Sequence, residues 1–149
     1  MKNEPTIIGW REWVALPKLG LPTILAKMDT GAKTSVLHAF SVEEFFVNAE
    51  RKVRFSVHPL PENNNSQIVE CVANVYDERV VSDSSGRKEL RYVIKTPLVF
   101  AGFTWPIEVT LTNRDTMRFR MLIGRSALKE KKIIVDPTIS FSYLNETSK

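Results

Sequence analysis

Short runs in which apolar and polar residues alternate recur along this chain of 149 residues. In one of them, Val53, Phe55 and Val57 alternate with Arg54 and Ser56. A period of two places the apolar side chains on one face of a β-strand, and turn residues separate the runs. The pattern therefore predicts an all-β chain, folded as a barrel or a sandwich. The same alternation is present in residues 34–40, 106–112, 117–124 and 138–144.

Glycines, prolines and polar residues separate these runs and indicate where the turns lie. Gly86 stands between two strand-like runs, residues 77–81 and 89–96, and predicts a hairpin with an exposed tip. Residues 59–67 are polar and bounded by prolines, so they predict a surface loop and an insertion. We also expect a strand at residues 68–76.

The helix signal is weak. The best candidate is residues 126–132, with Ser126 as the N-cap and lysines near the end, where the helix dipole favours cations. Residues 42–46 are expected to form a short helical turn. The chain then returns to extended structure at residues 133–137.

Length and composition predict one domain, residues 1–149, with a core of roughly residues 8–144. No apolar run approaches the ~20 residues that span a bilayer, and the start lacks a signal-peptide pattern. We therefore expect a cytoplasmic protein with no membrane partner. The net charge of +4 is a mild basic bias. Nucleic acid ranks last among partners, because aromatic residues do not interleave with the basic runs.

Residue types that bind metals are scarce. Cys71 is the one cysteine, and His38 and His58 are the two histidines. None has zinc-site spacing, and no phosphate-cradling glycine loop is present, so we expect neither a metal nor a cofactor. Cys71 is expected to be a small buried hydrophobe, His38 a hydrogen-bonded core residue and His58 a surface residue.

Two motifs carry the functional signal. The apolar run from Ile24 to Met28 ends at Asp29, which begins the stretch Asp-Thr-Gly-Ala of residues 29–32. About ninety residues later, the stretch "MLIGRSAL" places apolar residues directly before Gly124 and a short helix after it. An aspartate in a turn often only caps its own backbone. The same arrangement is also how a strand presents a carboxylate for chemistry.

This pair of motifs resembles aspartic peptidases, and a single Asp-Thr-Gly resembles the retropepsins. Further stretches, among them "GWREWVALPKL", "SGRKELRYVIKT", "TLTNRDTM" and "VDP", are similar to one bacterial family of retropepsin-like aspartic endopeptidases. Members of that family also carry the label "ATP-dependent zinc protease", which fits these residues badly. The resemblance extends from about Ile8 to Ser142. It implies a closed acid-protease barrel with one short C-terminal helix after the apolar-apolar-Gly motif.

The resemblance also implies roles for single residues. Asp29 would be catalytic, and the Thr30 hydroxyl would lock the loop by hydrogen bonding. Gly31 and Gly124 would let backbones approach closely, with Ala32 completing the loop. The hairpin from Val80 to Tyr92 would be the flap over a bound peptide. Apart from the resemblance, four basic residues near the second motif and the hairpin could favour acidic peptides: Arg79, Arg91, Arg114 and Arg125.

The function implied is hydrolysis of peptide bonds by an aspartate pair and an activated water, with one Asp29 from each subunit of a homodimer. No metal would be needed. One alternative is a peptide-binding module that keeps the barrel but has no turnover. Lys33, which follows Ala32 where many retropepsins place an acid, and the long spacing between Asp29 and Gly124 depart from the family pattern.

Overall fold

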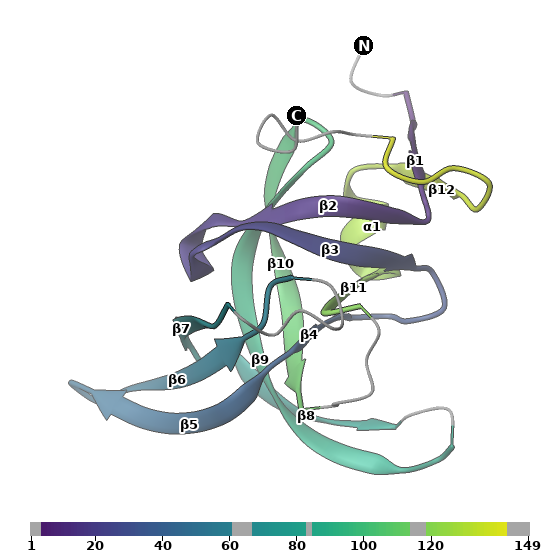
Figure 1. The fold of residues 1–149 in the computed structure, drawn as a ribbon. Coiled ribbons are helices and arrows are strands. Elements are labelled where there is room, and N and C mark those ends of the chain that lie inside the picture. Colours follow the sequence, from purple (N-terminus) through teal and green to yellow (C-terminus); the bar gives the residue numbers. More distant parts are fainter. Residues whose placement is uncertain (1–3, 61–66, 83–84, 114–118, 143–149) are drawn as a thin grey trace.

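Twelve strands, one 3₁₀ turn and one short α-helix form the secondary structure within the part of the chain that the computed structural model describes (Figure 1). That part is residues 4–60, 67–82, 85–113 and 119–142. The prediction of a mostly β chain with one short helix is confirmed.

Seven strands form the largest sheet, in the order β10-β4-β11-β3-β2-β9-β8. β10 pairs with β9 as well as with β4, and β2 meets β9 at one pair, Ala15 with Val99. Closure of these strands into a single barrel stays a prediction. The strands are β2 (Arg11–Leu16), β3 (Leu21–Asp29), β4 (Ser35–His38), β8 (Asp77–Ser82), β9 (Lys88–Phe100), β10 (Phe103–Thr112) and β11 (Met121–Gly124).

Two smaller sheets flank it. Strands β5 (Phe40–Val47), β6 (Glu50–Val57) and β7 (Val69–Asn74) form an antiparallel sheet, which we call the outer sheet. Strands β1 (Thr6–Gly9) and β12 (Ile133–Asp136) form a parallel pair. The 3₁₀ turn is η1 (Pro17–Leu19), and the helix is α1 (Arg125–Glu130). The outer sheet projects from one end of the molecule (Figure 1).

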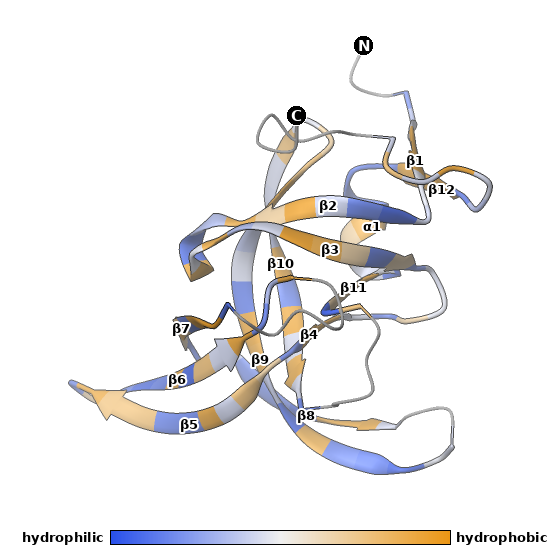
Figure 2. Ribbon diagram, viewed as in Figure 1, coloured by the Kyte–Doolittle hydropathy of each residue, from blue (hydrophilic) through white to orange (hydrophobic). Residues whose placement is uncertain are grey.

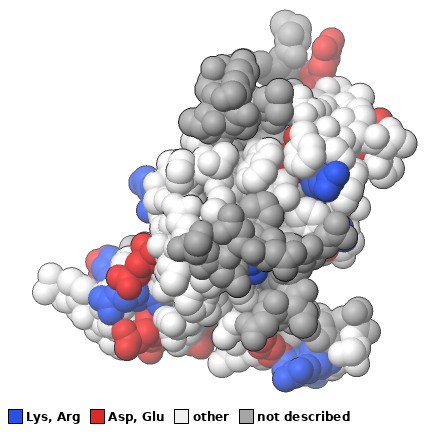
Figure 3. Space-filling view, in the orientation of Figure 1, with Lys and Arg blue, Asp and Glu red and all other residues white. Residues whose placement is uncertain are grey.

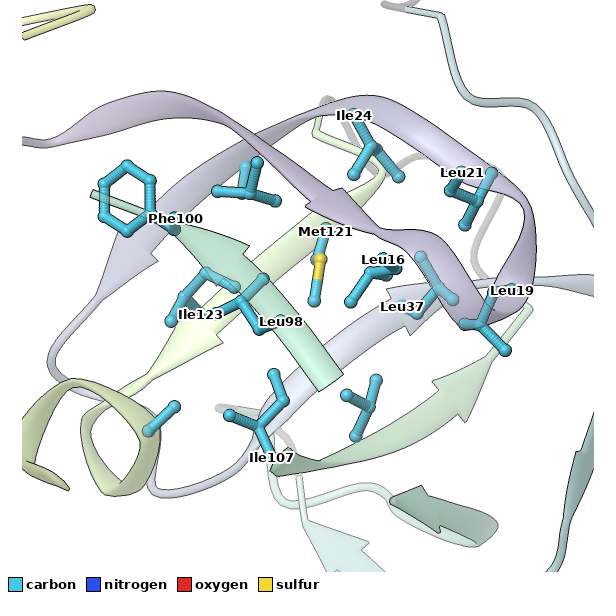
Figure 4. Packing of buried hydrophobic residues seen from close by; sticks show 14 of the residues in the cluster. Leu16, Leu19, Leu21, Ile24, Leu37, Leu98, Phe100, Ile107, Met121 and Ile123 are labelled. Carbon is cyan, nitrogen blue, oxygen red and sulfur yellow. The ribbon is translucent and has the colours of Figure 1, made fainter. Parts of the chain in front are cut away.

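The alternation in sequence decides which side chains are buried. In β6, Val53, Phe55 and Val57 are fully buried, whereas Arg54 and Ser56 are half-exposed on the other face. Figure 2 shows the resulting change of hydropathy along the ribbons. The core of the large sheet gathers apolar side chains from strands far apart in the sequence, as Figure 4 shows, among them Leu16, Leu37, Leu98, Met121 and Ile123.

Several strand predictions are confirmed. Residues 53–57 lie in β6 and residues 106–112 in β10, while β7 occupies most of residues 68–76. β8 and β9 pair as the predicted hairpin, in which Gly86 has a φ of 86°. Of the predicted loop at residues 59–67, residues 61–66 lie outside the described part.

Residues 42–46 do not form a helical turn. They belong to β5, where Glu44 pairs with Val53 and Phe46 pairs with Arg51 of β6. The turn between the two strands contains Asn48 and Ala49, both with positive φ. Pairing with a neighbouring strand has overridden the weak local helix preference.

The helix begins one residue earlier than predicted, at Arg125, and Gly124 is its N-cap. Ser126 is therefore inside the helix and is not its cap. Lys131 and Lys132 follow the helix, whose last residue is Glu130. Backbone contacts of Gly124, described below, fix this start.

No strand forms at residues 138–142, the described part of the last predicted run. The Ile139 carbonyl accepts a hydrogen bond from the amide of Trp10, and the Phe141 amide donates to the Arg11 carbonyl. Phe141 has a φ of 55°, which breaks the extended conformation between these contacts.

Candidate functional site

The structure brings the two sequence motifs together. β3 ends at Asp29 and runs parallel to β11, and Gly124 is the register partner of Asp29. After Asp29 the chain turns through residues 30–34 before β4 begins. The Asp29 loop, residues 29–34, thus lies beside the start of α1, as the pair of motifs predicted.

Gly124 is required at this position because the Asp29 loop packs directly against it. A Cβ atom at Gly124 would lie 2.6 Å from the carbonyl carbon of Thr34. The amides that follow continue the contact, since Arg125 donates to the Ala32 carbonyl at 2.8 Å and Ser126 donates to the Lys33 carbonyl at 3.1 Å. The predicted close approach at Gly124 is confirmed.

Gly31 has a different role from the one predicted. Its amide donates a hydrogen bond to Oδ1 of Asp29 at 3.1 Å, and a Cβ atom at Gly31 would meet only that oxygen among neighbours beyond the adjoining residues. Asp29 therefore caps its own turn, which was the simpler interpretation of the sequence. Its other carboxylate oxygen, Oδ2, has no hydrogen-bond partner among the described residues.

The hydrogen bonds that hold the loop come from Ser35 and Arg125. The Ser35 hydroxyl is buried and accepts from the Gly124 amide at 3.0 Å. Nη1 of Arg125 donates to the Gly31 carbonyl at 3.1 Å and the Thr30 carbonyl at 3.4 Å. The predicted lock by the Thr30 hydroxyl is wrong, because Thr30 is exposed and is held through its carbonyl. Sequence reasoning missed Ser35, although a serine at the start of the strand after the motif is a visible signal.

A groove runs between the Asp29 loop and the hairpin formed by β8 and β9. Two adjoining cavities of about 670 and 750 Å³ share Lys33, Thr34, Val81, Ser82 and Thr110, so we treat them as one and call it the Asp29 groove. Its described lining contains three carboxylates and five cations: Asp29, Glu108, Glu130, Lys33, Arg79, Arg91, Lys95 and Arg125.

The predicted basic residues differ in how their charge is used. Arg79 is paired with Asp77 at 2.8 Å and with Glu108 at 2.7 Å. Its hydrogen bond to Asp77 raises the pKa of the guanidinium and lowers the pKa of the Asp77 carboxyl. Arg91 is buried and pairs with Glu89, whereas Arg125 is exposed. Arg114 lies outside the described residues.

Other candidate residues lie away from the groove. Cys71 is buried in the outer sheet, and desolvation raises the pKa of its thiol to about 12. His38 is buried, as predicted. His58 is half-buried and stacks on Phe40, with ring centroids 4.5 Å apart.

Neither a metal site nor a membrane-spanning helix is found in the described part of the chain. It contains no group of three or more His, Cys, Asp or Glu residues arranged to hold a metal ion. Within the same residues, no helix has the length and apolar character needed to cross a membrane.

Comparison with known proteins gives one family match. A family model described as "Retropepsin-like aspartic endopeptidase RimB" matches residues 7–146. A solved structure from Legionella pneumophila, described as a protein of unknown function, is similar with a TM-score of 0.76 and 27% identity. The similarity covers 93% of this chain and 98% of that one.

Curated relatives carry a different description, "Probable alpha-L-glutamate ligase". One from Desulfotalea psychrophila is 46% identical over 96% of this chain, and one from Shewanella pealeana is 43% identical over 95%. A third, from Parasynechococcus marenigrum, is 47% identical over 88% of this chain. The chain spans about 30% of the length of these relatives.

These relatives correct the function expected from the sequence. Hydrolysis of peptide bonds by an aspartate pair is a protease activity, whereas the relatives are named for forming a bond to glutamate. The coarser expectation of an enzyme agrees with their name. A catalytic role for Asp29 stays a prediction.

Proposed function

The chain belongs to the RimB-like family, and we propose that it takes part in alpha-L-glutamate ligation by holding a glutamate-bearing peptide in the Asp29 groove. A ligase that joins glutamate makes a product with additional carboxylates. A protein that acts beside such a ligase therefore needs a surface that accepts several negative charges in an extended chain.

The charge of the Asp29 groove is the observation that supports this proposal. Arg79 and Arg91 pair with carboxylates, so the charges of the described lining that have no ion pair among the described residues are three cations, Lys33, Lys95 and Arg125, and two carboxylates, Asp29 and Glu130. Lys33 is exposed, lines both cavities and has no side-chain ion pair among the described residues. An excess of cations in a concave surface attracts an acidic ligand and raises its local concentration.

Asp29 provides the opposite charge at one end of the groove. Its Oδ1 is occupied by the Gly31 amide, so Oδ2 can accept a hydrogen bond from an N–H group. A glutamate residue within a peptide carries one backbone N–H and one side-chain carboxylate. We propose that Asp29 accepts from a backbone N–H of the peptide while the cations of the groove bind the side-chain carboxylates.

An extended peptide can also use the edge of the hairpin. β8 is at the end of the large sheet, and residues 79–82 of this strand line the groove. Backbone groups at a sheet edge pair with extended peptides, whose alternate side chains then point to the same side. This geometry suits a run of glutamates, because it presents every second carboxylate to the same wall.

The test is a titration with two fluorescent peptides that end in four glutamates or in four glutamines. We expect the glutamate peptide to bind more tightly, and Lys33→Met to weaken its binding by about two- to fivefold. Lys27→Met is the matched control, because Lys27 is exposed on β3 and does not line the groove. Equal affinity for the two peptides, or an equal effect of the two variants, would contradict the proposal.

Two further expectations stay proposals. A homodimer is checked by sedimentation at several concentrations, with and without the glutamate peptide. A cytoplasmic location is checked by fractionation of cells that produce the protein.

A further inference from the structure

Arg91 is a cation held at the wall of the Asp29 groove with little exposure. It lies in β9, it is 7% exposed, and it lines the cavity that contains Asp29. Burial of a charged side chain is costly unless partners satisfy it. The contacts that allow this charged side chain to be buried therefore have to be identified, which an exposed arginine would not require.

Two neighbours fix the orientation of the Arg91 guanidinium. Its Nε donates to Oε1 of Glu89 at 2.5 Å, and its Nη1 donates to the hydroxyl of Thr110 at 3.4 Å. Glu89 also accepts from the hydroxyl of Thr112 at 2.9 Å. A planar group that is held at two of its nitrogens is oriented before any ligand arrives.

The same hydrogen bonds connect Arg91 with the Asp29 loop. The Thr110 hydroxyl donates to the Ser35 carbonyl at 3.3 Å, and the Ser35 hydroxyl accepts from the Gly124 amide. Thr110 and Ser35 are both buried. The position of the guanidinium is thus tied to the backbone that positions Asp29.

One nitrogen of Arg91 has unused capacity. Guanidinium has five N–H donors, and Nη2 has no hydrogen-bond partner among the described residues. Arg91 lines the cavity that contains Asp29, so a ligand in the groove is within reach of this side chain. Arg79, which pairs with Arg91 across β8 and β9, has two carboxylate partners of its own.

We propose that Arg91 determines specificity by binding a glutamate carboxylate of the peptide through Nη2. This inference rests on the proposed function, because it names the residue that distinguishes glutamate from glutamine in the same groove. A carboxylate accepts a charge-assisted hydrogen bond from the oriented donor. The amide of glutamine carries no charge, and its NH₂ group cannot accept from Nη2, so it makes a weaker contact.

The experiment compares the glutamate and glutamine peptides on the wild-type protein and three variants. Arg91→Lys keeps the positive charge but loses the planar guanidinium. The double variant Arg91→Met with Glu89→Gln removes the guanidinium and the Glu89 carboxylate together, so that the carboxylate is not left without its partner. Arg54→Met is the control, because Arg54 lies on the outer sheet outside the groove. Circular dichroism and thermal melting establish that each variant is folded.

We expect the double variant to lose about 10- to 100-fold in affinity for the glutamate peptide and to change little toward the glutamine peptide. Arg91→Lys should keep only part of the preference for the glutamate peptide over the glutamine peptide. The control, Arg54→Met, should keep all of that preference. A folded double variant with the wild-type preference would overturn the role of Arg91 while leaving the proposed function in place. A wild-type protein that binds neither peptide would overturn both.

Discussion

The Asp29 groove and the outer sheet both carry arginines, but they use them differently. On the outer sheet, Arg54 is about 41% exposed, pairs with Glu43 at 3.1 Å and lies over the ring of Phe45. Arg51 of the outer sheet contacts Glu44 on β5 and Glu78 on β8. Figure 3 shows charged side chains of both signs intermixed at this end of the molecule. The groove instead holds Arg91 with little exposure, and its Nη2 has no hydrogen-bond partner among the described residues.

The contrast between exposed and buried arginines shows which charged side chains can contribute to recognition. An exposed pair is screened by solvent and contributes little to stability or recognition. A buried and oriented donor is costly to keep, so a ligand that satisfies it gains more than it would at the surface. Counting basic residues in the sequence cannot make this distinction.

The largest expected difference between the two regions is in reactivity. The inner face of the outer sheet encloses Cys71, whose thiol pKa is raised to about 12 by desolvation, whereas the groove is open. At pH 8 such a thiol has about one thousandth of the thiolate of a thiol with a pKa near 9. We expect alkylation of native Cys71 by iodoacetamide to be slower by about that factor than in urea, measured by mass spectrometry.

The raised pKa also has a consequence for stability. The folded state keeps the thiol protonated, so its contribution is complete below the ordinary pKa of 9.0 and is lost as pH rises toward 12. Cys71→Ala should remove this part of the pH dependence. Rapid labelling of the native protein at pH 8 would show that the outer sheet does not enclose the thiol.

The second-largest effect is expected when two glycines are replaced by alanine, because each glycine is needed for a different reason. Gly124→Ala places a Cβ atom against the Thr34 backbone, and we expect it to lower the free energy of unfolding by about 1–3 kcal/mol and to weaken peptide binding. Gly102 has a φ of 81° and open space around it, so Gly102→Ala should cost about 1 kcal/mol without an effect on binding. Urea unfolding and the peptide titration measure both. Equal effects on binding would remove Gly124 from the site.

The smallest effect is expected on the outer sheet. Arg54→Met breaks an exposed pair with Glu43, and we expect a change in the free energy of unfolding below about 1 kcal/mol. Peptide affinity should be unchanged in the same sample. A loss of binding comparable to that of the Arg91 variants would mean that the outer sheet belongs to the recognition surface.

Contacts that depend on short motifs could be predicted from the sequence. Asp29 and Gly124 lie side by side, as the paired motifs predicted, and the hairpin around Gly86 is present. Residues 42–46 differ from the predicted helical turn because their strand exists through pairing with β6. Propensity in a short window does not contain that information.

Partners that are distant in the sequence account for the other omissions. Glu12 is fully buried because it accepts from the amide of Gly9 at 2.7 Å and from the amide of Ser142 at 2.9 Å. Ser142 is 130 positions away in the chain, so nothing near Glu12 indicates this contact. The function was mistaken for a related reason: the motifs describe a fold and a loop, and such features are shared by proteins with different activities.

Amide hydrogen exchange with the glutamate peptide bound tests the central claim most directly. The account predicts that protection increases in the Asp29 loop and in residues 79–82 of β8, because these segments line the groove. The outer sheet should exchange at the same rate with and without the peptide, and the glutamine peptide should produce no protection at matched concentration. Protection confined to the outer sheet, or identical protection by both peptides, would contradict a groove that recognises glutamate carboxylates.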